Sequence, residues 1–300
     1  MRRVLPFLFL LACSPAASDR TTIAVIPKGT SHEFWKSVHA GAAKAAADLD
    51  VDIVWKGPAK ENDREGQIKV VEDAIVRGVG AIVLAPLDDT ALVPVAKDAG
   101  SQGIPVVVFD SALEWDGQAA FVATDNTRGG RLGGERLAEL IGGEGKVLML
   151  RYLEGSASTS KREQGFLDAI AEHPGIEVVS SNQYGGATTE SCMAAAENLL
   201  NNFADVDGIF CPCEPAAFGM LRALQDSGRA GEVRFVGFDA TDKMVEAVRR
   251  GEIDALVLQD PFRMGELAVR QAMSVIHGAD LGEFVDTGVH LLDAANVDSE

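Results

Sequence analysis

The chain has 300 residues and a formal net charge of −18, with 45 acidic residues against 27 basic ones. This length is enough for two domains with sizeable hydrophobic cores. The acidic balance argues against a nucleic-acid partner, which would bind to a basic face.

The N-terminal residues are typical of an export signal. Two arginines precede an apolar run at 4–11, which is too short to span a bilayer and leads into Cys13. This start resembles a bacterial lipoprotein signal, which implies that residues 1–12 are removed, that Cys13 is lipidated and that 13–20 form a tether. The resemblance places the protein in the periplasm or at the cell surface, held to a membrane by lipid alone. An ordinary signal peptide or a buried apolar N-terminus is the alternative.

From residue 21 onward, short apolar runs alternate with helical patterns. In the first part of the chain we expect strands at 23–26, 51–55, 81–84, 104–109 and 121–123, with helices at 33–49, 62–77 and 90–102. Apolar runs this short, separated by helices and short joints, are typical of strands buried in parallel sheets. The alternation predicts an α/β protein built from doubly wound parallel sheets.

The pattern then repeats. We expect strands at 146–150, 177–180, 208–211, 235–238 and 255–258, with helices at 160–172, 188–203, 214–227, 242–250 and 262–277. A glycine-rich run at 129–134 opens a further helix that ends at 141. The spacing of its glycines does not match a dinucleotide-binding fingerprint, so we interpret the run as close packing beside a hinge.

Two of the expected strands end on an acid, Asp110 in the first part and Asp239 in the second. Ligands of open α/β sheets bind outside the carboxyl ends of the strands. A carboxylate accepts hydrogen bonds and donates none, which suits hydroxyl groups. Alternatively, Asp239 or Thr241 caps the helix that begins at 242. The repeated pattern favours a cleft between two lobes in which both acids face one ligand.

Further landmarks accompany the two acids. In chain order they are Phe34-Trp35, Asp110, Thr124-Asp125-Asn126, Arg162 four residues before Phe166, Val236-Gly237-Phe238-Asp239, and Gln259 before Asp260-Pro261. As a set, over residues 21 to 292, they resemble the ribose-binding-protein family of bacterial periplasmic sugar receptors. This resemblance implies the type I periplasmic-binding-protein fold, with two lobes joined by three hinge crossings. The N-terminal lobe would be 21–124 plus 260–287, and the C-terminal lobe 125–259 plus 288–300.

The resemblance also implies a set of ligand-binding residues. They are His32, Phe34, Trp35, Asp110, Ser111, Arg162, Cys213, Asp239 and Gln259. The aromatic rings would pack on a sugar ring and the acids would accept its hydroxyl groups. Arg162 would donate to an oxygen of the ligand, unless it forms a surface salt bridge with Glu163. Core packing is the alternative for the two aromatic residues, and a purely structural hinge role is the alternative for Gln259.

Several positions depart from the ribose-receptor pattern. Ser111 stands where that family has an arginine, and Cys213 where it has an asparagine. The aromatic residue of the second lobe falls near Ala187, unless Tyr184 replaces it. Lys28, after the first strand, is a candidate for a replacement positive charge. These departures predict a rearranged pocket, so we do not expect ribose itself as the ligand.

With Cys13 set aside for lipidation, three cysteines remain, at 192, 211 and 213. A metal site would need a fourth ligand at suitable spacing, and no histidine lies near them in sequence. A disulfide from Cys192 to Cys211 or Cys213 and three buried free thiols are both compatible with the sequence. We expect neither a metal nor a cofactor.

The sequence contains no Gly-x-Ser-x-Gly elbow, phosphate loop or His-Glu-x-x-His pair, so we do not expect an enzyme. The resemblance implies a monomeric solute-binding lipoprotein of an ABC-type importer that closes on a sugar or polyol and delivers it to permease and ATPase subunits. The alternative is a sensing module that presents its closed form to a chemoreceptor or sensor kinase. A transcription regulator of related fold is disfavoured because the chain starts with an export-like signal.

Overall fold

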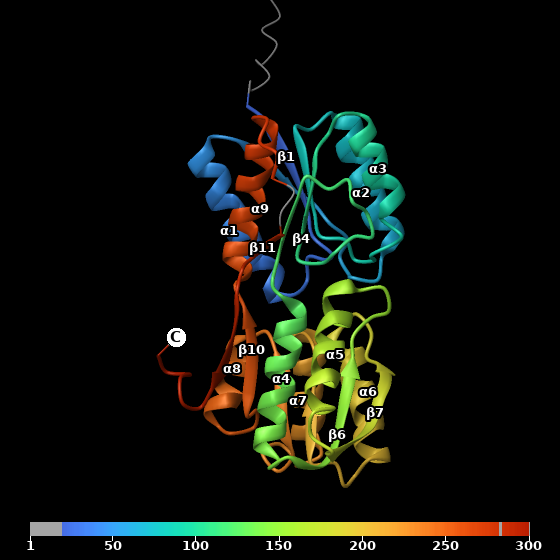
Figure 1. The fold of residues 1–300 in the computed structure, drawn as a ribbon, viewed down its shortest axis with the longest axis vertical. Coiled ribbons are helices and arrows are strands. Elements are labelled where there is room, and N and C mark those ends of the chain that lie inside the picture. Colours follow the sequence, from blue (N-terminus) through green and yellow to red (C-terminus); the bar gives the residue numbers. More distant parts are fainter. Residues whose placement is uncertain (1–19, 282–283, 300) are drawn as a thin grey trace, which may run out of the picture.

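The computed structural model describes residues 20–281 and 284–299. The expected signal at 1–12, the lipidation site Cys13 and positions 13–19 of the tether lie outside these residues. The described chain forms two lobes, one above the other, and each lobe has a six-stranded sheet with helices on both faces (Figure 1). This is the two-lobed α/β architecture that the alternating pattern predicts.

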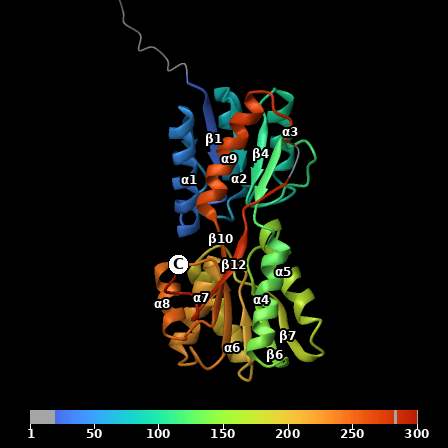
Figure 2. The ribbon, with the colours of Figure 1, turned by 60° about the vertical axis from the view of Figure 1, so that its left-hand side comes forward.

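The sheet of the first lobe is entirely parallel, in the order β11-β5-β4-β3-β1-β2. Its strands are β1 (Thr22–Ile26), β2 (Asp52–Trp55), β3 (Ala81–Leu84), β4 (Val106–Phe109), β5 (Ala120–Ala123) and β11 (Phe284–Asp286). Helices α1 (Glu33–Leu49) and α9 (Pro261–Ile276) pack side by side on one face (Figure 2), and α2 (Arg64–Arg77) and α3 (Val93–Ser101) cover the other. Strands such as β3 and β4 are buried throughout because both faces are covered.

The sheet of the second lobe has the order β12-β10-β9-β8-β6-β7, and only the β10–β12 pair is antiparallel among the described strands. Its strands are β6 (Glu144–Arg151), β7 (Gly175–Tyr184), β8 (Gly208–Phe210), β9 (Arg234–Phe238), β10 (Ala255–Gln259) and β12 (Val289–Asp293). One face carries α4 (Asn126–Leu140) and α5 (Ala157–Ile170). The other carries α6 (Thr189–Asn202), α7 (Glu214–Asp226) and α8 (Asp242–Arg249).

Within the described residues the chain passes between the lobes three times, after β5, after β10 and after β11. The first and third crossings lie side by side. The amide of Thr287 donates to the carbonyl of Ala123 at 3.0 Å, and the hydroxyl groups of Thr124 and Thr287 are 3.3 Å apart. These two crossings are therefore joined by hydrogen bonds where the chain passes between two separately packed cores.

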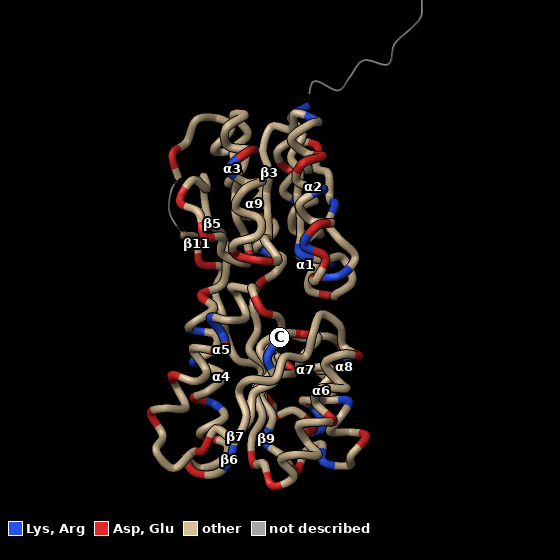
Figure 3. The backbone as a smooth tube through the Cα atoms, turned by 90° about the vertical axis from the view of Figure 1, so that its right-hand side faces the viewer, with Lys and Arg blue, Asp and Glu red and all other residues tan. Residues whose placement is uncertain are grey.

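Some boundaries differ from the sequence-based expectation. The strand expected at 177–180 extends over Gly175–Tyr184, because it lies at the edge of the sheet beside the long strand β6. The helix expected at 160–172 begins earlier, at Ala157, directly after the N-cap Ser156. In the described part of the chain, no helix combines the length and the apolar character that a membrane span requires. Acidic and basic residues are interspersed over both lobes (Figure 3).

Candidate functional site

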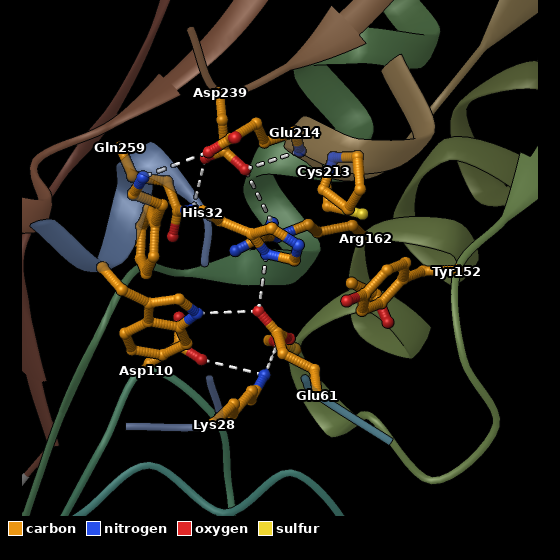
Figure 4. A pocket seen from close by; sticks show the side chains of 15 residues that line it. Lys28, His32, Glu61, Asp110, Tyr152, Arg162, Cys213, Glu214, Asp239 and Gln259 are labelled. Atoms are coloured by element: carbon orange, nitrogen blue, oxygen red, sulfur yellow. Dashed lines mark hydrogen bonds and ion pairs between the residues drawn. The ribbon is translucent and has the colours of Figure 1, made fainter. Parts of the chain in front are cut away.

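A narrow cavity with many polar side chains in its lining lies between the lobes. The first lobe lines it with Lys28, His32, Phe34, Trp35, Glu61 and Asp110. The second lobe lines it with Tyr152, Ser158, Thr159, Arg162, Cys213, Glu214, Pro215 and Asp239, and Gln259 completes it at the second crossing. Eight of the nine ligand-binding residues expected from the sequence are in this set, and the exception is Ser111. Figure 4 shows the polar side chains of both lobes converging on the same space.

Asp110 and Asp239 directly follow β4 and β9, and both have a left-handed backbone, with φ of 61° and 65°. Among the described non-glycine residues, Asp50 is the other one with positive φ. This conformation costs roughly 1–2 kcal/mol for most L-residues, although aspartate tolerates it better than most. Strained backbone held at two strand ends that line one cavity is a pattern typical of a functional site.

Asp239 is held from three sides. Its Oδ1 accepts a hydrogen bond of 2.7 Å from Nε2 of Gln259, and its Oδ2 accepts one of 3.1 Å from the amide of Glu214. Nη1 of Arg162 lies 3.9 Å from Oδ2. Burial raises the pKa of Asp239 above its usual value, although the charge of Arg162 opposes this shift. The carboxylate is thus fixed in place while it faces the cavity.

Helix capping does not explain Asp239. The N-cap of α8 is Thr241, whose hydroxyl accepts a hydrogen bond from the amide of Met244. Because Thr241 satisfies the start of α8, the carboxylate of Asp239 is not needed to cap that helix.

Asp110 forms an ion pair of 2.9 Å with Nζ of Lys28, and both side chains are almost completely buried. The same ammonium group donates a 2.8 Å hydrogen bond to the hydroxyl of Ser158 in the opposite lobe. Lys28 therefore supplies the positive charge at this end of the cavity and also links the lobes. Ser111 is not among the residues that line the cavity, and its hydroxyl accepts a 3.0 Å hydrogen bond from the amide of Ser158.

Arg162 is buried in the second lobe rather than paired at the surface. Its Nε donates to Oδ1 of Asn126 at 2.7 Å, and its Nη1 donates to the carbonyl of Pro212 at 3.0 Å. The guanidinium group lies 4.0 Å from the centre of the Phe238 ring. Glu163, the surface partner considered from the sequence, pairs with another arginine. These contacts hold the fork of Arg162 beside Asp239.

Glu61 lines the cavity although no sequence pattern predicted it. It lies in the loop between β2 and α2, and its Oε1 accepts hydrogen bonds from Nε1 of Trp35 at 2.7 Å and from Nδ1 of His32 at 2.9 Å. Burial alone would raise the pKa of Glu61, but the hydrogen bond and charge of His32, with Lys28 and Trp35, lower it to about 2. The carboxylate therefore stays ionised and positions two side chains of the cavity.

Glu214 connects the two lobes at another point of the cavity lining. Although it belongs to α7, its carboxylate accepts hydrogen bonds from the amides of Glu33 and Phe34 at the start of α1, at 3.3 and 3.1 Å. The N-terminus of a helix favours a negative charge, so this contact stabilises the approach of the two lobes. Sequence reasoning interpreted Glu214 only as a helix start.

The second-lobe aromatic residue of the cavity is Tyr152. Ala187 and Tyr184, the positions considered from the sequence, are absent from the cavity lining among the described residues. Tyr152 directly follows β6, is only 2% exposed and packs in the core of the lobe. The carboxyl ends of the parallel strands all point to the cleft, and this rule could have identified Tyr152 from the sequence.

The cysteines at 192, 211 and 213 are buried free thiols, without a disulfide among the described residues. Burial raises the pKa of Cys213, which lines the cavity, well above its usual value, so it contributes a neutral thiol. Within residues 20–281 and 284–299, no group of three or more His, Cys, Asp or Glu side chains is arranged to hold a metal ion.

Two α/β lobes with a polar cavity between them, and strand-end acids facing it from both sides, define a two-lobed solute-binding protein. A family model described as a periplasmic binding protein domain matches residues 23–280, and the chain belongs to this family. Within it the chain is a ribose-binding-like type I periplasmic sugar-binding protein. The similarity is to binding proteins of sugar transport and not to enzymes.

The relatives span nearly the same length as this chain. The ribose import binding protein of Haemophilus influenzae is 31% identical over 268 residues, which cover 89% of this chain and 90% of that protein. A solute-binding protein from Agrobacterium vitis with bound D-fucose is 36% identical, with a TM-score of 0.89 and coverage of 92% and 97%. One from Agrobacterium radiobacter in complex with D-arabinose is 32% identical, with a TM-score of 0.90 and coverage of 93% and 96%.

Proposed function

We propose that this chain is the substrate-binding subunit of an ABC-type importer and that its lobes, 21–124 plus 260–287 and 125–259 plus 288–300, close on one molecule of a neutral sugar or polyol. The observation that carries this proposal is the convergence of Asp110 and Asp239, from strand ends of different lobes, on one cavity. Strand-end carboxylates accept the hydrogen bonds that hydroxyl groups donate.

The charge balance of the cavity favours an uncharged ligand. Asp110 is paired with Lys28 at 2.9 Å, and Glu61 is paired with His32 at 2.9 Å. Asp239 has Arg162 at 3.9 Å. Glu214 accepts hydrogen bonds from the start of α1. Because each carboxylate is already compensated within the protein, a charged group on the ligand would enter the buried site without a partner.

The proposal includes the location and the partners. We infer a lipidated Cys13 that anchors the mature protein in the periplasm or at the cell surface, and a monomer that delivers its ligand to permease and ATPase subunits. Relatives named as import proteins favour transport over the alternative role of a sensing module. Labelling of the full chain with a radioactive fatty acid, lost in the Cys13→Ala variant, would test the anchor.

A thermal-shift screen against neutral sugars, polyols, uronic acids and hexosamines tests the ligand class. A ligand present at about 100 times its Kd stabilises the native state by about 2.7 kcal/mol. We expect a rise in Tm with at least one neutral sugar or polyol, and a smaller rise with the same compound in the Asp239→Asn variant. Stabilisation by charged sugars alone would contradict the proposed ligand class.

A further inference from the structure

Among the described residues, the hydroxyl group of Tyr152 makes no hydrogen bond of standard geometry, although the side chain is only 2% exposed and the carboxylate of Glu61 lies near it. A buried hydroxyl without a partner costs about 1–3 kcal/mol relative to a satisfied one. Such groups are rare in folded proteins and call for an explanation. Here the group faces a cavity rather than the apolar core, so a bound molecule can supply the missing partner.

The ring of Tyr152 is held firmly. It directly follows β6 and packs in the same hydrophobic cluster as Cys192 and Cys213, both of them buried. In Figure 4 the ring projects toward the centre of the site, opposite Asp110 and Gln259. Burial, with the nearby carboxylate of Glu61, raises the pKa of Tyr152 well above its usual value, so the group stays protonated and can donate. A rigid ring with a neutral hydroxyl at its tip is suited to forming a hydrogen bond with one particular group of a ligand.

A second unpaired atom lies across the cavity. The Oε1 atom of Gln259 is buried and has no hydrogen-bond partner in the part of the chain that the structure describes, while its Nε2 donates to Asp239. The empty space therefore has an acceptor on one side and a hydroxyl group on the other. A polyhydroxylated ring can satisfy both at once, because each of its hydroxyl groups donates one hydrogen bond and accepts others.

We propose that the Tyr152 hydroxyl is a specificity-determining contact, which forms a hydrogen bond with one particular hydroxyl group of the bound sugar from the second lobe. This inference rests on the proposed function, and it identifies which side chain distinguishes that sugar from its analogue without the hydroxyl. A site built to bond a hydroxyl group rejects the analogue that lacks it, because the buried partner is then left unsatisfied.

The chain offers a matched control, since Tyr184 is its only other tyrosine. The Tyr184 ring lies under the guanidinium group of Arg151, 4.4 Å from its carbon atom, and does not line the cavity. The experiment compares the wild type, Tyr152→Phe and Tyr184→Phe by isothermal titration calorimetry. The titrants are the neutral sugar that binds most tightly in a monosaccharide panel and each of its monodeoxy analogues.

In the Tyr152→Phe variant we expect the Kd for the parent sugar to rise about 5- to 150-fold, which corresponds to the loss of one buried hydrogen-bond partner. One deoxy analogue alone should bind the variant and the wild type equally well, and Tyr184→Phe should match the wild type throughout. The ligand-free Tyr152→Phe variant should have an unchanged or higher Tm, because the removed hydroxyl makes no hydrogen bond of standard geometry with the described residues.

Two results would overturn the inference while leaving the proposed function intact. One is a Kd for Tyr152→Phe equal to that of the wild type for every sugar. The other is an equal loss of affinity for the parent and all its deoxy analogues, which would make the hydroxyl a contact between the lobes, directed at Glu61, rather than a contact with the ligand. A wild type that binds no neutral sugar or polyol would overturn the proposed function itself, and the inference with it.

Discussion

The indole Nε1 of Trp35 donates a 2.7 Å hydrogen bond to Oε1 of Glu61, and both side chains are buried. The same oxygen lies 2.9 Å from Nδ1 of His32. One carboxylate, from a loop outside the strand-end pattern, therefore fixes the orientation of an aromatic ring and an imidazole that both face the ligand cavity. Rings fixed in this way lose less conformational freedom when a ligand binds.

Replacing Glu61 tests this role. In Glu61→Gln the amide oxygen can still accept from both donors, but it is neutral, so the charge that strengthens the hydrogen bond with His32 is lost. We expect a loss of about 1–3 kcal/mol in the free energy of unfolding and a Kd raised about tenfold, measured by thermal denaturation and calorimetry. Glu72→Gln, at an exposed position of α2, is the control and should change neither value. An unchanged Kd in Glu61→Gln would show that the hydrogen bonds do not prepare the site.

Binding should also depend on pH through His32. Burial lowers the pKa of His32, but the hydrogen bond and charge of Glu61, the charge of Glu214 and the backbone of Ala187 together raise it above 6.5. Glu214 and Ala187 belong to the second lobe, so the contact between the lobes favours the protonated ring. A group with a raised pKa in the closed form contributes fully below its ordinary value, and the contribution is lost as pH rises through the raised one.

We therefore expect tighter ligand binding at about pH 6 than at about pH 8, measured by calorimetry across this range. In His32→Gln the affinity should vary much less between the two values. His173→Gln, in the connection between α5 and β7 and away from the cavity lining, should keep the wild-type dependence. Equal slopes in the wild type and His32→Gln would exclude His32 as the titrating group.

The two aspartates that line the cavity can be compared with a third aspartate, Asp50, which has the same left-handed backbone conformation. Asp110→Asn and Asp239→Asn should each raise the Kd at least tenfold, because the amide replaces a charged acceptor by a donor. Asparagine tolerates positive φ, so the circular dichroism spectrum should be unchanged. Asp50→Asn is the matched control, with φ of 55° but an exposed side chain at the end of α1. Wild-type affinity in both cavity variants would contradict their assignment to the ligand.

The outcome for individual residues shows where sequence reasoning succeeds. Asp110 and Asp239 could be predicted because a buried parallel strand ends on each, and the fold directs such ends to a common cleft. Glu61 could not be predicted, because its hydrogen-bond partners Trp35 and His32 lie 26 and 29 residues earlier in the chain. Only the packing of the Glu61 loop against α1 brings the three side chains together. Ser111 was expected at the site from the family resemblance, but it is not among the residues that line the cavity, and its hydroxyl accepts from the amide of Ser158 in the opposite lobe.

Tyr152 and Lys28 illustrate an intermediate case. Both follow a strand that ends at the cleft, so their location was accessible from the pattern. One of these side chains faces the cavity with its hydroxyl, and the other binds across the lobes. This difference depends on the direction of each side chain, and the sequence periodicity does not determine that direction at the end of a strand. The ion pair of Lys28 with Asp110 and its hydrogen bond to Ser158 required the tertiary structure.

The contact of Glu214 with α1 predicts an effect on closure. Glu214→Ala removes the acceptor of two helix amides and a favourable interaction with the helix dipole, worth about 0.3–2 kcal/mol. We expect the Kd to rise about 2- to 30-fold, and small-angle scattering with saturating ligand should show unchanged compactness because the ligand holds the lobes together. Glu33→Gln, which removes only an exposed ion pair with Lys36, should bind like the wild type. A Kd of Glu214→Ala equal to that of Glu33→Gln would remove Glu214 from the closure contacts.

A substitution in the glycine-rich start of α4 should weaken ligand binding, although this segment does not line the cavity. A Cβ added at Gly130 would lie 1.9 Å from the carbonyl oxygen of Arg162 on α5, a backbone atom that cannot move away alone. Gly130→Ala must therefore separate α4 from α5 and displace Arg162 from Asp239. We expect a loss of about 1–3 kcal/mol in the free energy of unfolding and a higher Kd.

The control for this substitution is Gly100→Ala in α3, where an added Cβ would lie 3.5 Å from the Trp115 ring, an ordinary contact. In a helix alanine is favoured over glycine by about 1 kcal/mol, so this variant should be as stable as the wild type or more so and should keep its Kd. Urea denaturation and calorimetry of both variants give the comparison. If Gly130→Ala lost stability but kept the wild-type Kd, the position of Arg162 would not depend on the close contact between α4 and α5.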